Sequence, residues 1–206
     1  MNAKTLHRFF PIVPPEEVKI LDIQTPQVED ETYRIICESS GSRPSVNTSW
    51  YMDGRIIADS KVFREGIKTR STVQVTLMAA DNGARLTCRV KNDLVPSYIM
   101  EDSITLNVLY RPQVHLSLGE NLNVAAIHEG VDVYFECSVA SNPKKYQIQW
   151  FKNDQELFHN ISKGIILSNM SLVLQKVTHN TGGSYRCSAY NSQGRGASDA
   201  IYLNIK

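Results

Sequence analysis

Short runs of alternating hydrophobic and polar residues recur along the chain. Such alternation predicts β-strands with one face in a core and the other in solvent. Two of these runs lead into a cysteine, and their predicted inward residues are Tyr33, Ile35 and Cys37 in the first and Val131, Val133, Phe135 and Cys137 in the second. Further runs cover residues 73–77, 86–90, 172–175 and 185–189, with turn-forming pairs such as Asp53-Gly54 and Asn153-Asp154 between runs. No stretch shows a long helical period, so the pattern predicts an all-β fold.

The same landmarks occur twice at a shift of about 100 residues. Trp50 follows Cys37 by 13 residues, and Trp150 follows Cys137 by 13 residues. The second cysteine of each half lies 51 or 50 residues after the first, and an asparagine follows it four residues later. A repeat of one domain's length indicates a duplicated domain. The paired landmarks of this repeat are Cys37 and Cys137, Trp50 and Trp150, Cys88 and Cys187, and Asn92 and Asn191.

The cysteine spacing argues against a metal or redox site. The sequence has four cysteines, none in a Cys-x-x-Cys pair and none with a histidine at metal-ligand spacing. An even number of cysteines on well-separated strands suits two disulfides, which form in an oxidising compartment.

Cysteine, then tryptophan 13 residues later, then a second cysteine about 50 residues after the first, resembles an immunoglobulin domain of the C2 or I type. The resemblance implies two tandem β-sandwiches, over residues 15–110 and 111–206, with residues 1–14 as a linker or the tail of a preceding domain. It also implies that the disulfides are Cys37–Cys88 and Cys137–Cys187, each packed against a buried tryptophan, Trp50 or Trp150.

The second half fits the immunoglobulin pattern better than the first. Tyr185, two residues before Cys187, stands at the tyrosine-corner position of that fold. Thr181 replaces the aspartate that is usual in this motif, so the salt bridge of that aspartate is not expected. In the first half, Leu86 occupies the tyrosine position, as in C2-type domains of adhesion receptors.

The junction at residues 108–112 contains no Gly/Ser tract and ends in proline. A flexible linker would need such a tract. Leu109 and Tyr110 could form a stiff apolar linker or could extend a strand. Both possibilities predict an elongated rod.

Composition excludes several functional classes. The 206 residues are 42% hydrophobic and 21% charged, with a formal net charge of +1, which is typical of a folded chain and unlike a nucleic-acid-binding protein. No apolar run approaches the roughly 18 residues that span a bilayer. The first residues are too polar for a signal peptide. We therefore expect a fragment of a longer surface protein, whose membrane anchor lies outside this sequence.

The sequence carries no recognisable catalytic motif, so we expect neither enzymatic activity nor a cofactor or metal. Its five histidines are scattered, pair with no carboxylate at a useful spacing and are expected at the surface. Residues 41–91 hold nine Lys and Arg against four Asp and Glu, which could form a basic face for heparan sulfate. The seven acidic residues among positions 15–40 favour a mixed, solvated surface instead.

Three Asn-x-Ser/Thr sequons begin at Asn47, Asn160 and Asn169. The alternation places Asn47 and Asn169 on the solvent side of their strands. N-glycosylation at these positions would agree with an extracellular location.

The amino-acid sequence of the second half carries a more specific resemblance than the general immunoglobulin pattern. The segments 129–137, 141–145, 148–150 and 168–177 resemble the Sidestep family of arthropod neuronal surface receptors, and the first half does so more loosely. The resemblance implies the second and third immunoglobulin domains of a single-pass membrane receptor. It implies binding to immunoglobulin-superfamily proteins of the Beaten-path type, in axon guidance or synaptic matching. Recognition is expected mainly through a preceding domain, so no partner-binding residue is assigned.

Two alternatives remain open at this point. One is a homophilic or heterophilic adhesion molecule of the nephrin and irregular-chiasm type. The other is the ectodomain of a receptor kinase or phosphatase, with catalysis outside these residues.

Overall fold

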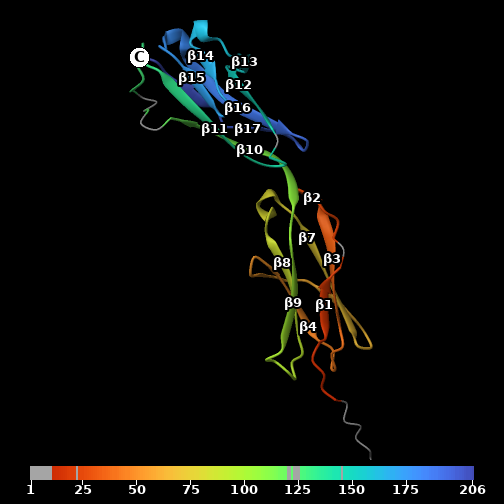
Figure 1. Ribbon diagram of the computed structural model, residues 1–206. Coiled ribbons are helices and arrows are strands. Elements are labelled where there is room, and N and C mark those ends of the chain that lie inside the picture. Colours follow the sequence, from red (N-terminus) through yellow and green to blue (C-terminus); the bar gives the residue numbers. More distant parts are fainter. Residues whose placement is uncertain (1–10, 22, 120–121, 123–125, 145) are drawn as a thin grey trace, which may run out of the picture. The chain divides into compact units, whose positions relative to one another are not determined.

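The computed structural model describes residues 11–21, 23–119, 122, 126–144 and 146–206. The chain divides into two compact units, Met1–Val108 and Leu109–Lys206, and each is built of β-strands (Figure 1). The prediction of an all-β chain with two tandem immunoglobulin-like sandwiches is confirmed. His7 and the first ten residues of the expected tail 1–14 lie outside the described residues.

Unit 1 is a sandwich of two four-stranded antiparallel sheets. One sheet has the order β1-β3-β7-β6 and the other β5-β4-β8-β9. A short strand, β2, contributes the fully buried Gln27, whose side-chain oxygen accepts a hydrogen bond from the Asn107 amide at 3.0 Å. The strands of unit 1 are β1 (Glu17–Ile20), β2 (Gln27–Val28), β3 (Thr32–Ser40), β4 (Asn47–Met52), β5 (Arg55–Ile57), β6 (Lys61–Glu65), β7 (Lys68–Thr76), β8 (Arg85–Lys91) and β9 (Ile99–Thr105).

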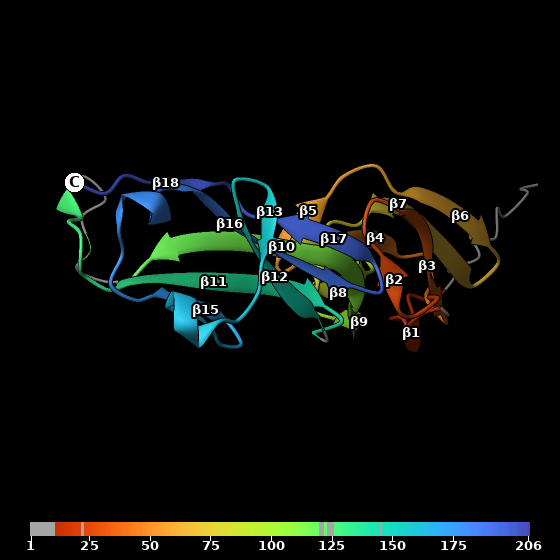
Figure 2. The same cartoon turned by 90° about the horizontal axis from the view of Figure 1, so that it is seen from above.

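Unit 2 repeats this plan. One sheet contains β14-β15-β11-β10, and Figures 1 and 2 both show β15 beside β11. The other has the order β13-β12-β16-β17, with β18 also paired to β16. Leu109 and Tyr110 belong to a strand, the second of the two possibilities for the junction. The strands are β10 (Val108–Leu118), β11 (Val133–Asn142), β12 (Gln147–Lys152), β13 (Gln155–Leu157), β14 (Ile165–Leu167), β15 (Ser171–Leu174), β16 (Gly183–Asn191), β17 (Gly194–Ala197) and β18 (Ile201–Leu203).

Helical structure in the described part of the chain is confined to short 3₁₀ turns. None of the described helices has the length and apolar run needed to cross a membrane. The named turns are η1 (Ala79–Asp81), η3 (Ile161–Lys163) and η4 (His179–Thr181).

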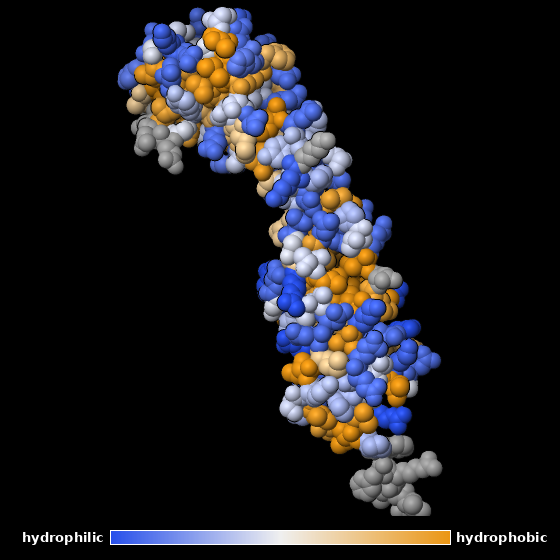
Figure 3. Space-filling view, viewed as in Figure 1, coloured by the Kyte–Doolittle hydropathy of each residue, from blue (hydrophilic) through white to orange (hydrophobic). Residues whose placement is uncertain are grey.

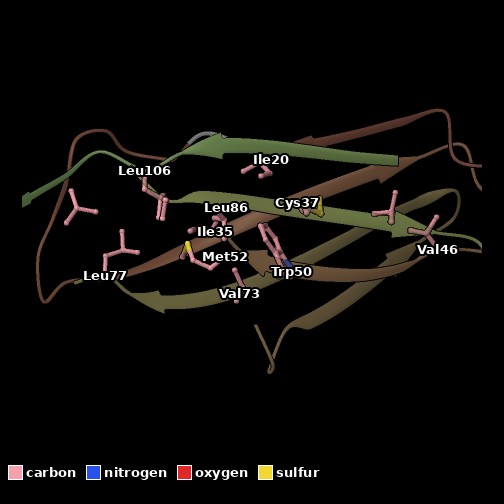
Figure 4. Packing of buried hydrophobic residues seen from close by; sticks show 14 residues of the cluster. Ile20, Ile35, Cys37, Val46, Trp50, Met52, Val73, Leu77, Leu86 and Leu106 are labelled. Carbon is pink, nitrogen blue, oxygen red and sulfur yellow. A yellow bond between two sulfur atoms is a disulfide. The ribbon is translucent and has the colours of Figure 1, made fainter. Parts of the chain in front are cut away.

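Each unit has its own hydrophobic core between its two sheets. In unit 1 the largest buried side chain is Trp50, surrounded by residues of both sheets such as Ile35 and Leu86 (Figure 4). In unit 2, Phe135, Trp150 and Tyr185 take the corresponding central place. Burying aromatic and branched side chains between two sheets is the main source of stability in a sandwich of this size.

One predicted core residue lies outside the core. Val131 was expected to share the inward face of Val133, Phe135 and Cys137, but its side chain is 41% exposed. The strand β11 begins only at Val133, so the alternation of a strand does not extend back to Val131. Instead, the Val131 carbonyl accepts a hydrogen bond from the Val177 amide at 2.8 Å. This backbone bond joins the segment before β11 to the segment after β15.

Candidate interaction surfaces

The disulfide of unit 1 joins its two sheets. It links Cys37 on β3 to Cys88 on β8, and both half-cystines are buried. Trp50 on β4 is paired in register with Cys88 and is fully buried, and its indole Nε1 donates to the buried Ser71 Oγ at 2.9 Å. This bond satisfies the one polar atom of the indole in the core. The cluster is structural.

Unit 2 contains the corresponding cluster with one addition. A disulfide links Cys137 on β11 to Cys187 on β16, and Trp150 is 2% exposed. Tyr185 stacks on Phe135 at a centroid distance of 5.0 Å and donates from its hydroxyl to the Thr181 carbonyl at 2.5 Å. Burial raises the pKa of the Tyr185 hydroxyl. The tyrosine corner uses a backbone acceptor here, so it forms with threonine in place of aspartate.

The repeated asparagines perform the same task in both units. Asn92 is fully buried, and its amide nitrogen lies 3.0 Å from Ser42 Oγ and 3.1 Å from the carbonyls of Arg43 and Pro44. Asn191 donates to the carbonyls of Tyr110 at 2.9 Å and Pro143 at 3.3 Å. Each asparagine therefore holds, by hydrogen bonds to backbone carbonyls, the proline turn that follows the first cysteine of its unit. The sequence revealed the repetition of these residues, but their role needed the structure.

The outer face of the β4–β8–β9 sheet in unit 1 carries the first sequon. Asn47 is exposed there, in register with Lys91. Further along the same face, the Arg89 guanidinium lies 4.7 Å from the centre of the Tyr51 ring, and its Nε lies 3.0 Å from a Glu101 carboxylate oxygen. The hydrogen bond to Glu101 raises the pKa of Arg89. Arg89 is therefore already paired.

The outer face of the β12–β16–β17 sheet in unit 2 presents an aromatic ring close to two cations. The guanidinium carbons of Arg186 and Arg195 lie 5.8 and 5.2 Å from the centre of the Phe151 ring. Arg186 pairs with the Asp154 carboxylate at 2.5 Å, whereas Arg195 donates to the buried Ser188 Oγ at 2.9 Å. The sequence pattern alone did not single out these residues. The alternation along β12 and β16 could have shown that Phe151 and Arg186 face outward, but not that they lie close together.

The other two sequons lie near the β14–β15 hairpin of unit 2. Asn160 precedes η3, where its side-chain oxygen accepts a hydrogen bond from Ser162 Oγ at 2.7 Å. Asn169 lies in the exposed turn between β14 and β15, and it lines a shallow hollow with Gln147. The side chains of both sequons are at least partly accessible. Their glycosylation stays a prediction.

The described histidines are exposed, as expected, but one of them has an acidic partner that the sequence spacing did not show. His179 Nδ1 lies 2.7 Å from a Glu129 carboxylate oxygen, although 50 residues separate the two. Hydrogen bonds from His179 hold the pKa of Glu129 below its usual range. No cluster of three or more metal-ligating side chains occurs among the described residues.

Four of the nine basic residues in the stretch 41–91 are paired with acids: Lys68, Arg70, Arg89 and Lys91. Arg70 Nε and Lys68 Nζ lie 2.6 and 3.4 Å from the two Glu38 carboxylate oxygens. Lys91 Nζ, at the end of β8, lies 3.4 Å from a carboxylate oxygen of Asp93 in the turn that follows. The surface of unit 1 is therefore mixed in charge, which argues against a dedicated polyanion site on it.

The end of unit 1 where β1 begins is hydrophobic. A cavity of about 650 Å³ there is lined by Ile12, Pro44, Ile67 and Leu94, among others. In the space-filling view, orange residues gather at this end of unit 1, and further orange areas lie elsewhere on the visible face (Figure 3). The cavity contains no cluster of catalytic side chains.

Comparisons with known proteins agree with this architecture. Residues 17–96 match the CD80-like C2-set immunoglobulin domain, and residues 111–191 match an immunoglobulin domain family. The chain therefore carries two immunoglobulin domains, one in each unit.

Curated relatives are cell adhesion molecules. Cell adhesion molecule 4 of Homo sapiens is 25% identical over 198 residues, covering 94% of this chain and 48% of the relative. Cell adhesion molecule 2 of Xenopus tropicalis is 24% identical over 195 residues, covering 92% of this chain and 44% of the relative. The chain thus spans less than half the length of these relatives.

Solved structures show the same fold. The full ectodomain of mouse nectin-like molecule 4, with three immunoglobulin domains, superposes with a TM-score of 0.67 at 23% identity, over 94% of this chain and 65% of that one. A titin A168169 structure superposes with a TM-score of 0.51 at 18% identity, over 95% of this chain and 100% of that one. These likenesses support the fold.

Proposed function

We propose that the chain is a non-catalytic recognition module of an adhesion receptor on the extracellular side of the plasma membrane. The observation that carries the proposal is the pair of disulfide-linked immunoglobulin domains whose curated relatives are cell adhesion molecules. Disulfides of this kind belong to oxidising compartments. The accessible sequons at Asn47, Asn160 and Asn169 support the same location.

The finer function rests on the resemblance of residues 129–177 to the Sidestep family. We propose a heterophilic partner of the Beaten-path type, another immunoglobulin-superfamily surface protein, and a role in axon guidance or synaptic target matching. A domain preceding residue 15 would make most of the contact with that partner, and these two domains would present it.

Among the alternatives, an adhesion molecule of the nephrin and irregular-chiasm type gains support from the cell adhesion relatives. A receptor kinase or phosphatase ectodomain has no comparable support. The two leading possibilities differ in their partners: the Sidestep-like one binds a Beaten-path protein, whereas the adhesion type binds its own kind or another adhesion molecule.

A binding assay with purified proteins tests the proposal. The full ectodomain and the 206-residue chain are each passed over a panel of immobilised immunoglobulin-superfamily ectodomains that includes Beaten-path proteins. We expect saturable binding of the full ectodomain to a Beaten-path protein and far weaker binding of the 206-residue chain. Full affinity in the 206-residue chain would place the site within these two domains. Binding to adhesion molecules alone would contradict the Beaten-path assignment.

A further inference from the structure

The outer face of β12, β16 and β17 in unit 2 has the composition of a protein-binding surface. Phe151 is half-buried and lies close to the guanidinium groups of Arg186 and Arg195, and Tyr190 on the same face is 40% exposed. Aromatic residues and arginine are enriched at the energetic centres of protein interfaces. The hydrogen bond from Arg195 to the buried Ser188 Oγ at 2.9 Å holds this guanidinium in place before any partner arrives.

Opposite charges lie on the two edge strands of this face. Glu156, on the edge strand β13, is in register with Phe151 and is exposed. Its carboxylate accepts a hydrogen bond from the neutral Gln149 side chain at 3.1 Å. Arg195, on the opposite edge strand β17, is held by the equally neutral Ser188. Over the described part of the chain, neither Glu156 nor Arg195 has an ion-pair partner, whereas Arg186 is paired with Asp154.

We propose that this face binds the same face of a second copy of the chain. A two-fold interface requires a self-complementary surface, in which each group meets its complement on the partner. An axis near Phe151 would bring Arg195 of each copy to Glu156 of the other and would pack the two Phe151 rings and their Tyr190 neighbours at the centre. The face would then contain two reciprocal ion pairs around an aromatic core.

Two observations favour this face and this occupant. The equivalent face of unit 1 carries the Asn47 sequon, and its Arg89 is already paired with Glu101 at 3.0 Å. The strands β12, β13, β16 and β17 carry no sequon, and Asn169 lies beside this sheet at the Gln147 end of β12. A polyanion such as heparan sulfate is disfavoured because Asp154 and Glu156 balance the two arginines of the face. Self-complementary charge therefore favours a second copy.

The expected association is weak. One face of a small sandwich falls at or below the low end of specific interface areas, about 1,200 Å². We therefore expect a dissociation constant on the order of 0.1 mM for the isolated chain. Many copies on a cell surface would strengthen such contacts through avidity. This self-association is independent of the proposed heterophilic partner, and either can fail without the other.

Sedimentation velocity over a concentration series of the glycosylated 206-residue chain tests the proposal. The variants are Arg195→Glu, Glu156→Arg and the double variant that carries both. Each single reversal places like charges opposite each other in both ion pairs, so we expect at least about tenfold weaker association. The double variant restores opposite charges across the two-fold axis and should recover most of the wild-type association. Arg89→Glu on unit 1 is the matched control and should leave association unchanged.

Circular dichroism and thermal melting confirm that each variant is folded. Because Glu156 is exposed, the Glu156→Arg variant keeps the test valid even if Arg195→Glu disturbs the fold. A wild-type chain that stays monomeric up to about 1 mM would overturn the proposal, since binding at that level is negligible. Association that survives the single reversals, or that the double variant fails to restore, would also overturn it. So would a loss of association in Arg89→Glu.

Discussion

At the scale of single residues, the repeated asparagines show how a polar side chain becomes part of a hydrophobic fold. Asn92 is fully buried, and its amide lies within hydrogen-bond distance of Ser42 Oγ and of the Arg43 and Pro44 carbonyls. Its own side-chain oxygen accepts the Leu94 amide at 3.0 Å. A buried carbonyl without a donor is costly, so one side chain satisfies several backbone groups at once.

Replacing these asparagines should destabilise the unit that contains them. We expect Asn92→Ala to lower the free energy of unfolding by about 1–3 kcal/mol, because it leaves buried carbonyls without donors. Asn191→Ala should cost less, because Asn191 is only half-buried. Urea unfolding measures both changes. Asn180→Ala, at an exposed position, serves as the control, and an equal effect of Asn180→Ala and Asn92→Ala would contradict this role.

The sequence predicted the positions of the core cysteines and tryptophans better than it predicted the side-chain contacts made between strands. Cysteine and tryptophan at repeated spacing located the centres of both cores, because few other residue types suit those positions. The arginines flanking Phe151 and the acidic partner of His179 could not be predicted in the same way. Their partners lie on other strands, and only the pairing of strands brings them together.

At the scale of strands, β17 approaches the start of β10 very closely. A Cβ atom built on Gly196 would lie 1.7 Å from the Pro112 carbonyl oxygen. Any side chain at this position must therefore push the two strands of unit 2 apart. Gly196 is required because the backbone of Pro112 lies too close for a side chain, and not because Gly196 has an unusual backbone conformation.

Gly196→Ala should accordingly destabilise unit 2. Forcing a methyl group into a packed site costs about 1–3 kcal/mol, and a backbone contact this short places the change at the upper end. Thermal melting should show a clear loss for Gly196→Ala and little change for Ala197→Ser, at the exposed neighbouring position. A melting temperature unchanged by Gly196→Ala would show that the strands separate without cost.

A cross-strand ion pair gives unit 1 a dependence on pH. Hydrogen bonds from Arg70 on β7, and then from Lys68, hold the pKa of Glu38 on β3 below its usual range. A lowered carboxyl pKa contributes stability that is present above the unfolded-state pKa and is lost as the pH falls through the folded-state pKa. The contribution is small, about 0–1 kcal/mol, because both cations that pair with Glu38 are more than half exposed.

Arg70→Gln should raise the pKa of Glu38 toward its ordinary value. Carboxyl NMR titration measures the shift directly. The unfolding free energies of wild type and variant should differ above the ordinary glutamate pKa and converge as the pH falls below the folded-state value. A pKa of Glu38 unchanged by Arg70→Gln would contradict the assignment of Arg70 as the main cause.

The start of β11 shows why strand boundaries were harder to predict than strands. Alternation continues through Val131 in the sequence, yet the strand begins at Val133. The Val131 carbonyl accepts a hydrogen bond from the Val177 amide, outside the ladder of β11. Periodicity cannot show where ladder pairing stops, because pairing depends on the neighbouring strand.

At the scale of the whole molecule, the sequence predicted two domains and their core landmarks, whereas the elongated rod stays a prediction. The three sequons are the strongest remaining test of compartment. Expressed through the secretory pathway, the chain should carry glycans at Asn47, Asn160 and Asn169. Mass spectrometry after enzymatic removal of the glycans should show up to three sites converted to aspartate. Secreted chain with none of the three converted would contradict the extracellular location.

The central claim is that these two domains belong to a receptor that recognises another immunoglobulin-superfamily surface protein. The most direct measurement is the binding of the purified full ectodomain to a panel of such proteins, followed by the same measurement on the 206-residue chain. We predict saturable binding of the full ectodomain to at least one panel member, of the Beaten-path type. Absence of binding to every panel member, with correctly folded and glycosylated protein, would contradict the claim.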